Sequence, residues 1–142
     1  MAGLSSGAKS AGANAAPVSA QEVTSPGPMY VWKERVVNLA DEGVRRYLKV
    51  GMSIEFTTHA DEFRKASPEE RAQKLAEFEK SIAPNAPVID DAIISLLSGR
   101  TSAEVGTPDG KARLKNDIKE TLNRLLGGEK VANIYFTQFV TQ

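Results

Sequence analysis

The chain has 142 residues, 41% hydrophobic and 25% charged, which is enough to bury one ordinary core but not two. Eighteen basic and eighteen acidic residues give a formal net charge of zero, so no global field attracts nucleic acid. Cysteine is absent, which excludes a disulfide framework, thiol catalysis and thiolate metal sites but leaves the compartment open.

Residues 1–29 are rich in Ala, Gly, Ser and Pro, and Lys9 and Glu22 are their only charged residues. Such a segment cannot offset its ordering entropy by burial, so we predict a disordered tail, either a native linker or partly added sequence. It has neither the apolar core of a secretory signal nor the ~20 apolar residues of a membrane helix. We expect one folded domain over residues 30–142.

Two strands open this domain. Residues 30–39 mix aromatic and β-branched side chains with spaced charges, as a strand with one wet face does. Residues 47–56 alternate strictly, with one face built from Leu48, Val50, Met52, Ile54 and Phe56. Because the link between them is short and contains Asp and Gly, we predict an antiparallel hairpin with one covered side.

Two helices follow the hairpin. Ser67 and Glu70 form a capping box with Pro68 at the first helical position, ahead of an apolar stripe through Ala72, Leu75, Phe78 and Ile82. After a proline-containing break at residues 83–87, residues 88–98 are apolar nearly all round, so we expect a helix pressed between the sheet and other protein. Residues 101–104 offer a second capping box for a single turn.

The last third of the chain predicts a capped helix, a glycine stop and a strand. Thr107, Pro108 and Asp109 mark a helix start, and Leu114, Ile118, Leu122 and Leu125 share one face up to Gly127 and Gly128. We predict a helix over residues 108–126. In the strand that follows, Ile134, Phe136 and Val140 alternate with Tyr135, Thr137 and Phe139, so we expect an internal strand that buries Phe136.

Residues with catalytic potential do not form a recognisable set. His59 is the only histidine and has no second histidine or cysteine for a zinc or nucleophile site, so a loop or surface role is expected. Asp90 and Asp91 are adjacent and point about 100° apart on a helix, which favours charge compensation in its first turn over metal binding. The segment GTPDG at residues 106–110 is not followed by the Lys and Ser/Thr of a phosphate loop.

Basic residues on the last helix are the best candidates for a partner surface. Lys111, Lys115 and Lys119 lie four residues apart, and Asp117 and Glu120 are placed to pair with arginines at i±4. One reading is a solvated helix face, and the other is a site for an acidic partner or anionic lipid headgroups. Trp32 is likewise either core packing or an interface anchor.

Three segments resemble the FliL family of flagellar basal-body proteins. The end of the chain, with NIYFTQFVTQ at residues 133–142, is similar to the family's "VYFTEFVIQ"-like strand, with Gln138 where an acidic residue is common. Residues 36–56, VVNLADEGVRRYLKVGMSIEF, resemble its "NLAD…RYLKV…LE" segment, and residues 90–110 give a weaker third match. The matches occur in the family's order and span most of residues 36–142.

The predicted elements give an α+β domain with an antiparallel sheet of three or more strands and helices packed on one face, and the resemblance implies similarity to the stomatin-type (SPFH) fold. It also implies a non-enzymatic periplasmic domain without cofactors, anchored in the inner membrane by one N-terminal helix missing from this chain. Such a domain associates with itself, as a ring or arc, and supports the stator proteins MotA and MotB. The alternative is a soluble α+β binding module or small hydrolase unrelated to motility, against which the lack of a base, nucleophile or metal set weighs.

Overall fold

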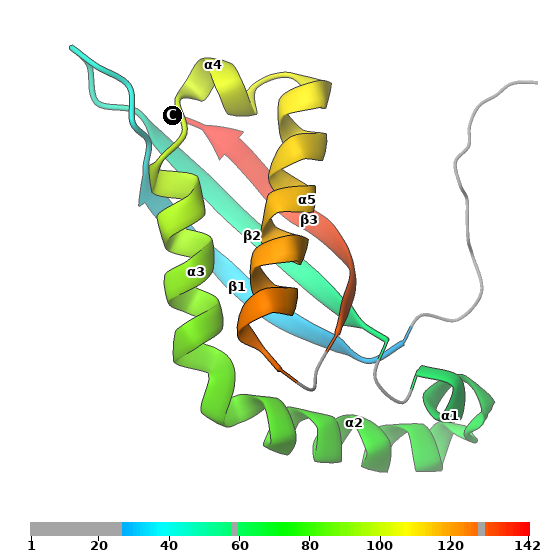
Figure 1. Ribbon diagram of the computed structural model, residues 1–142. Helices are drawn as coiled ribbons and strands as arrows, with labels where there is room; N and C mark the ends of the chain where they lie inside the picture. The colour runs from blue at the N-terminus through cyan, green and yellow to red at the C-terminus, as the bar shows by residue number, and fades with distance from the viewer. Residues whose placement is uncertain (1–26, 58–59, 128–129) are drawn as a thin grey trace, which may run out of the picture.

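The computed structural model in Figure 1 describes residues 27–57, 60–127 and 130–142. Three strands form one antiparallel sheet in the order β1-β2-β3, with β1 at Met29–Asn38, β2 at Tyr47–Phe56 and β3 at Val131–Thr141. The helices α3 (Ala86–Ser98) and α5 (Pro108–Leu125) lie side by side on one face of this sheet. The expected α+β class, with helices on one face, is confirmed, and the likeness to the SPFH fold stays a prediction.

The predicted hairpin of β1 and β2 is present, and its pairing explains the strict alternation in β2. Leu48, Val50, Met52, Ile54 and Phe56 are all fully buried beneath the helices. Their neighbours in the sequence, from Tyr47 to Glu55, lie on the opposite face, which no described helix covers. A strand with one covered side therefore follows from the period of two.

β3 is an edge strand, so the expectation that it is internal is wrong. Among the described residues it pairs only with β2, which lies in the middle of the sheet. Bulky side chains on both faces of β3 suggested an internal strand, but those on the open face stay exposed: Tyr135 is 42% and Val140 44% accessible. Phe136, expected to be buried, is only partly so.

The helix α2 (Pro68–Ile82) crosses the end of the sheet where β2 finishes (Figure 1). The Ser67–Glu70 capping box and the burial of Phe78 and Ile82 are as predicted, and Phe78 packs its ring 5.1 Å from that of Phe56. Ala72 is exposed and Leu75 partly buried, so the stripe contacts the core mainly through its C-terminal half. A short helix before α2, α1 (Ala60–Lys65), was not predicted.

The predicted break after α2 is a single helical turn, η4 (Ala83–Asn85), that leads directly into α3. Pro84 and Pro87 both occupy first-turn positions, where a proline costs no intrahelical hydrogen bond. The chain changes direction sharply between α2 and α3 (Figure 1). Because α3 begins at Ala86, Asp90 and Asp91 lie beyond its first turn. Their expected role in compensating the N-terminal charge is therefore wrong.

The turn α4 (Ser102–Val105) and the start of α5 are capped as predicted, by Thr101 with Glu104 and by Thr107. The segment GTPDG has a packing explanation. A Cβ on Gly110 would lie 1.7 Å from the carbonyl oxygen of Glu104, so only glycine lets α5 begin against the backbone of α4.

Leu114, Ile118 and Leu122 face the core from α5 as expected, but Leu125 is 49% exposed and Leu126 is buried in its place. The helix ends at Leu125, and Gly127 adopts a positive φ of 55° after it, which turns the chain toward β3. Gly128, the other predicted stop, and His59 lie outside the described residues.

The buried apolar side chains form one cluster between the sheet and the helices. At its lower edge Gly27 and Pro28, assigned to the tail by composition, are buried: Gly27 N–H donates to Glu55 Oε2 at 3.0 Å and Pro28 accepts from Phe56 N–H. The cluster consists of Trp32, Val37, Leu39, Leu48, Val50, Met52, Ile54, Phe56, Phe78, Ile82, Ile89, Ala92, Ile93, Leu97, Val105, Leu114, Ile118, Leu122, Leu126, Val131 and Ile134.

Candidate functional site

Lys111, Lys115 and Lys119, here called the lysine row, lie on the side of α5 that faces β3. Lys111 Nζ is 5.1 Å from the ring centroid of Phe139, and Lys115 Nζ is 5.4 Å from that of Phe136. All three lysines are partly exposed. Cation–π contacts of this length contribute about 0.5–1 kcal/mol at exposed sites, so they orient the ammonium groups along β3 without burying them.

A bulge in β3 creates the aromatic half of this surface. Phe136 pairs with Met52 and Phe139 with Val50, so the strand carries one extra residue, Thr137, between Gln138 and Phe136. The bulge places both rings on the helix-covered face, 4.7 Å apart, whereas strict alternation had put them on opposite faces. Nothing in the sequence marks the bulge, so the aromatic residues of this site were missed.

Acidic residues of α5 do not neutralise the lysine row. Asp117 pairs with Arg100, at the end of α3, and not with an arginine of its own helix as predicted. Among the described residues, no carboxylate forms an ion pair with any of the three lysines. The row therefore keeps a local positive charge on a chain whose net charge is zero.

Trp32 lies in the core. Its side chain is 1% exposed, and its Nε1–H donates to Asp90 Oδ1 on α3 at 2.9 Å. Arg35 stacks its guanidinium 4.2 Å from the indole centroid and reaches Asp90 Oδ2 at 3.7 Å. Of the two predicted roles for Trp32, these contacts support core packing. They also mean that Asp90 connects α3 to β1. The lysine row is the exposed part of the predicted surface.

Glu55, on the open face of the sheet, accepts three hydrogen bonds that were not predicted from the sequence. Its carboxylate accepts from Tyr135 Oη at 2.6 Å, from Asn133 Nδ2 at 3.1 Å and from Gly27 N–H. Partial burial raises the pKa of Glu55, but the bonds from Tyr135, Gly27 and Asn133 outweigh it and hold the pKa below its ordinary range. The group joins β2 to β3 and to the start of the fold.

Asp41, in the link between β1 and β2, is a second structural carboxylate. It accepts from Ser102 N–H at 2.7 Å and Ser102 Oγ–H at 2.6 Å, and these bonds lower the pKa of its carboxyl. Neither carboxylate belongs to a constellation with a nucleophile. Within residues 27–57, 60–127 and 130–142, no three His, Cys, Asp or Glu side chains are grouped to hold a metal ion.

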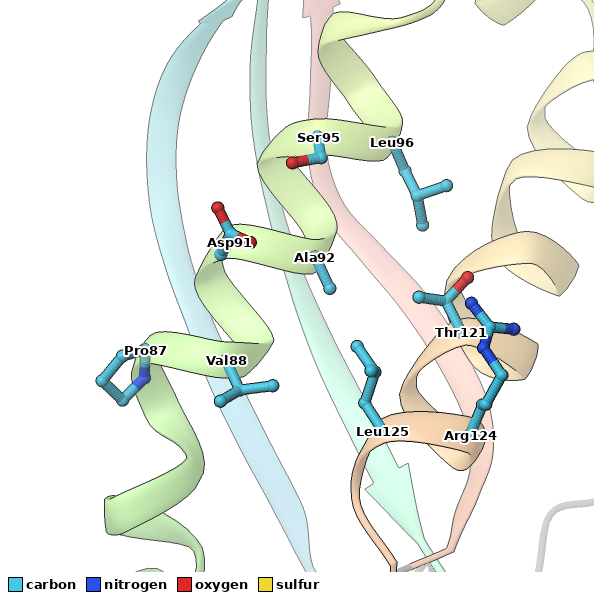
Figure 2. Close-up of a pocket in the computed structure, with 9 residues that line it drawn as sticks. All are labelled: Pro87, Val88, Asp91, Ala92, Ser95, Leu96, Thr121, Arg124 and Leu125. Carbon is cyan, nitrogen blue, oxygen red and sulfur yellow. The ribbon is translucent and has the colours of Figure 1, made fainter.

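A shallow groove of about 540 Å³ separates the first half of α3 from the last turn of α5 (Figure 2). Its lining is mainly aliphatic and includes the exposed Leu125, with one acidic residue, Asp91, and one basic residue, Arg124. This composition suits packing against apolar groups better than it suits catalysis. The lining residues are Pro87, Val88, Asp91, Ala92, Ser95, Leu96, Thr121, Arg124 and Leu125.

The described helices include none that is both long and apolar enough to cross a membrane. Residues 29–142 match the family model described as flagellar basal body-associated protein FliL. The chain is also similar to the flagellar protein FliL of Aquifex aeolicus, with 35% identity over 107 residues. This alignment covers 75% of the chain and 56% of the relative, so the chain spans little more than half of that protein's length.

Proposed function

Because the chain belongs to the FliL family of flagellar basal body-associated proteins, we propose that it is a non-enzymatic protein that supports the stator units of the motor. The observation that carries the proposal is the family match, which covers the whole of the described sheet and all of its helices. The proposed partners are further copies of the chain and the stator proteins MotA and MotB. The proposed location is the periplasmic side of the inner membrane.

Membrane attachment explains how such a domain assembles. In the proposal, an N-terminal helix beyond this chain anchors each copy, and the Aquifex relative has length that this chain does not cover. Tethering confines the copies to a thin layer and raises their effective concentration toward the millimolar range. Contacts too weak to populate at micromolar concentration then form a ring or arc beside the stator.

The lysine row is the proposed contact surface of the assembly or of the stator. Its charges are uncompensated by the described carboxylates, and its residues lie on one rigid helix. Lys111 and Lys115 are held in place by aromatic rings, so little side-chain entropy is lost when a partner binds. The groove between α3 and α5 has one acidic and one basic residue and no cluster of like charges, which makes it the weaker candidate for the contact surface.

The test is complementation of swimming in a bacterium whose own copy of the gene is deleted. The full-length protein with Lys115→Glu and Lys119→Glu should restore swimming poorly, although the purified domain should unfold at an unchanged temperature. Arg113→Glu with Arg124→Glu reverses the same number of charges on the same helix, at exposed positions outside the row, and should restore swimming fully. Equal motility in both variants would remove the lysine row from the function.

Self-association is tested on vesicles. The purified chain should be mostly monomeric in dilute sedimentation, and crosslinking should capture higher-order species when its N-terminus is attached to lipid. A tethered chain that stays monomeric would contradict the self-association part of the proposal and leave the stator part standing.

A further inference from the structure

The outer edge of β3 faces away from β2, and no strand of the described residues pairs with it. β3 has eleven residues, and within the described residues its backbone pairs only with β2. Val131–Thr141 contains no charged residue, whereas the other edge strand, β1, carries Lys33, Glu34 and Arg35 at its bulge. Charges and bulges are the devices that keep edge strands from pairing with other chains, and β3 has only bulges.

The accessible part of this edge can be delimited. Asn123 on α5 accepts a hydrogen bond from Val131 N–H at 2.6 Å and donates to Val131 C=O at 3.3 Å, so the first residue of β3 is occupied. Beyond it, the backbone groups that point away from β2 belong to the helix-face residues Ile134, Phe136, Phe139 and Thr141, because Tyr47 and Gln142 exchange both hydrogen bonds and the pairing alternates from there. An added strand would therefore pair with residues 133–141, which is also the stretch beside the lysine row.

The lysine row defines the charge of such a strand. Residues four apart on a helix are about 6 Å apart along its axis, and side chains on one face of a strand recur about every 6.7 Å. The two repeats are similar in length, although α5 crosses β3 at an angle (Figure 1). A strand placed against β3 would present alternate side chains on the face where Lys111 and Lys115 lie, and carboxylates at these positions would pair with their ammonium groups.

The opposite face of the added strand has a different neighbourhood. On the open face β3 exposes Tyr135 and Val140, which are 42% and 44% accessible. Apolar or β-branched side chains at the remaining positions would cover them, since cross-strand pairs of this kind stabilise sheets. The surface thus favours a segment in which acidic and apolar residues alternate.

A second copy of β3 fits this edge poorly. Two β3 strands paired about a two-fold axis would form one continuous sheet and bring two lysine rows toward each other on the same face. Like charges at close range oppose such pairing, and β3 itself offers no carboxylate to compensate them. The complementary partner is therefore a different protein.

We propose that β3 accepts an extended acidic segment of another protein as a fourth strand, with alternate carboxylates facing the lysine row. This inference deepens the proposed function, on which its biological role rests, by giving the chemistry of the partner at that surface. Backbone pairing supplies affinity and the side-chain alternation supplies specificity, as in other cases of strand addition.

The experiment uses the 142-residue chain and a synthetic peptide, acetyl-TEVEVEVET-amide. The expected result is saturable binding, with NMR shift changes and slowed amide exchange concentrated in residues 133–141. Methylation of the backbone nitrogens of the central Val and of the Glu before it should weaken binding at least ~tenfold, because one of two neighbouring N–H groups faces β3 whichever way the added strand runs. A peptide of the same composition with its glutamates in one block should also bind at least ~tenfold more weakly than the alternating peptide.

Two protein variants test the charge. Lys111→Glu with Lys115→Glu should weaken binding at least ~tenfold, and Arg113→Glu with Arg124→Glu should change it less than ~threefold. Equal binding of the blocked, N-methylated and alternating peptides would overturn the inference, because charge alone would then explain the attraction. Binding to anionic vesicles with no response to the peptide would overturn it in favour of lipid headgroups.

Motility separates this inference from the proposed function. Failure of the peptide to bind, with swimming still lost in the lysine variants, overturns strand addition and leaves the proposed function intact. The opposite result is also informative. If Lys111→Glu with Lys115→Glu abolishes peptide binding but still restores swimming fully, strand addition is supported and the role of this surface in the motor is overturned.

Discussion

The two edge strands of the sheet flank the same central strand but are secured in different ways. β1 is fixed to α3 by side chains, through the Trp32–Asp90 hydrogen bond and the stacked Arg35, and it carries charges along its middle. β3 has no charged residue and lies beside the lysine row of α5. In our proposal the difference separates a structural edge from one that accepts a partner, although both strands pair with β2.

Truncating one large aromatic residue on each edge should give the greatest contrast. Trp32→Ala should lower the free energy of unfolding by about 3–5 kcal/mol, since the side chain is fully buried and its removal leaves a cavity. Phe136→Ala should cost less, about 1–3 kcal/mol, because its ring is only partly buried at the edge. Urea denaturation of both variants measures the difference, and equal costs would mean that β3 is as deeply embedded as β1.

The tie between β1 and α3 should respond to a single substitution. Asp90→Ala removes the acceptor of the buried indole N–H and should cost about 1–3 kcal/mol. Asp91→Ala is the matched control, since this neighbour is exposed and lines the groove, and it should change stability by less than about 0.5 kcal/mol. A similar loss in both variants would show that the hydrogen bond to Trp32 adds nothing specific.

Local patterns allowed much of this fold to be predicted. The five fully buried residues of β2 follow from alternation, and the caps at Ser67, Thr101 and Thr107 follow from side chains that satisfy free amides. These features depend only on residues close together in the sequence, which is why they could be predicted without a structure.

Features set by distant contacts could not be predicted. The bulge at Thr137 depends on pairing with β2, and it determines which aromatic rings meet the lysines. Asp90 and Asp117 find their partners on other elements, so the helix-terminus role predicted for Asp90 and the i±4 arginine partner predicted for Asp117 were both wrong. The lysine row was found because its spacing is local, but its aromatic half and the open strand beside it required the tertiary structure.

The hydrogen bonds that hold β3 on the open face should give the domain an acid-sensitive component. Glu55 has a lowered pKa, so its stabilising contribution is complete above its ordinary value of about 4.5 and is lost as pH falls toward the folded value. Glu55→Gln should therefore reduce the fall in stability between about pH 5 and about pH 3. Denaturation at several pH values measures this, with the exposed Glu77→Gln as control; an unchanged slope would mean that Glu55 contributes no linkage.

The smallest expected effect on stability gives the sharpest comparison of the edges. Val36 and Val140 pair with opposite sides of Lys49, on the open face, and both are exposed. Val36→Lys and Val140→Lys therefore place the same new charge beside the same residue, one on each edge strand. Each should cost about 0.5–1 kcal/mol of stability, the scale of strand propensity and of one like-charge contact.

Their effects on binding should diverge. Val140→Lys puts a charge where the apolar side of an added strand would lie, so it should weaken binding of the alternating peptide about tenfold or more. Val36→Lys leaves β3 unchanged and should leave binding unchanged, as measured by titration of each variant under the same salt conditions. Equal weakening by both variants would place the peptide on the shared face of the sheet and not at the edge of β3, and the distinction between the two edges would then fail.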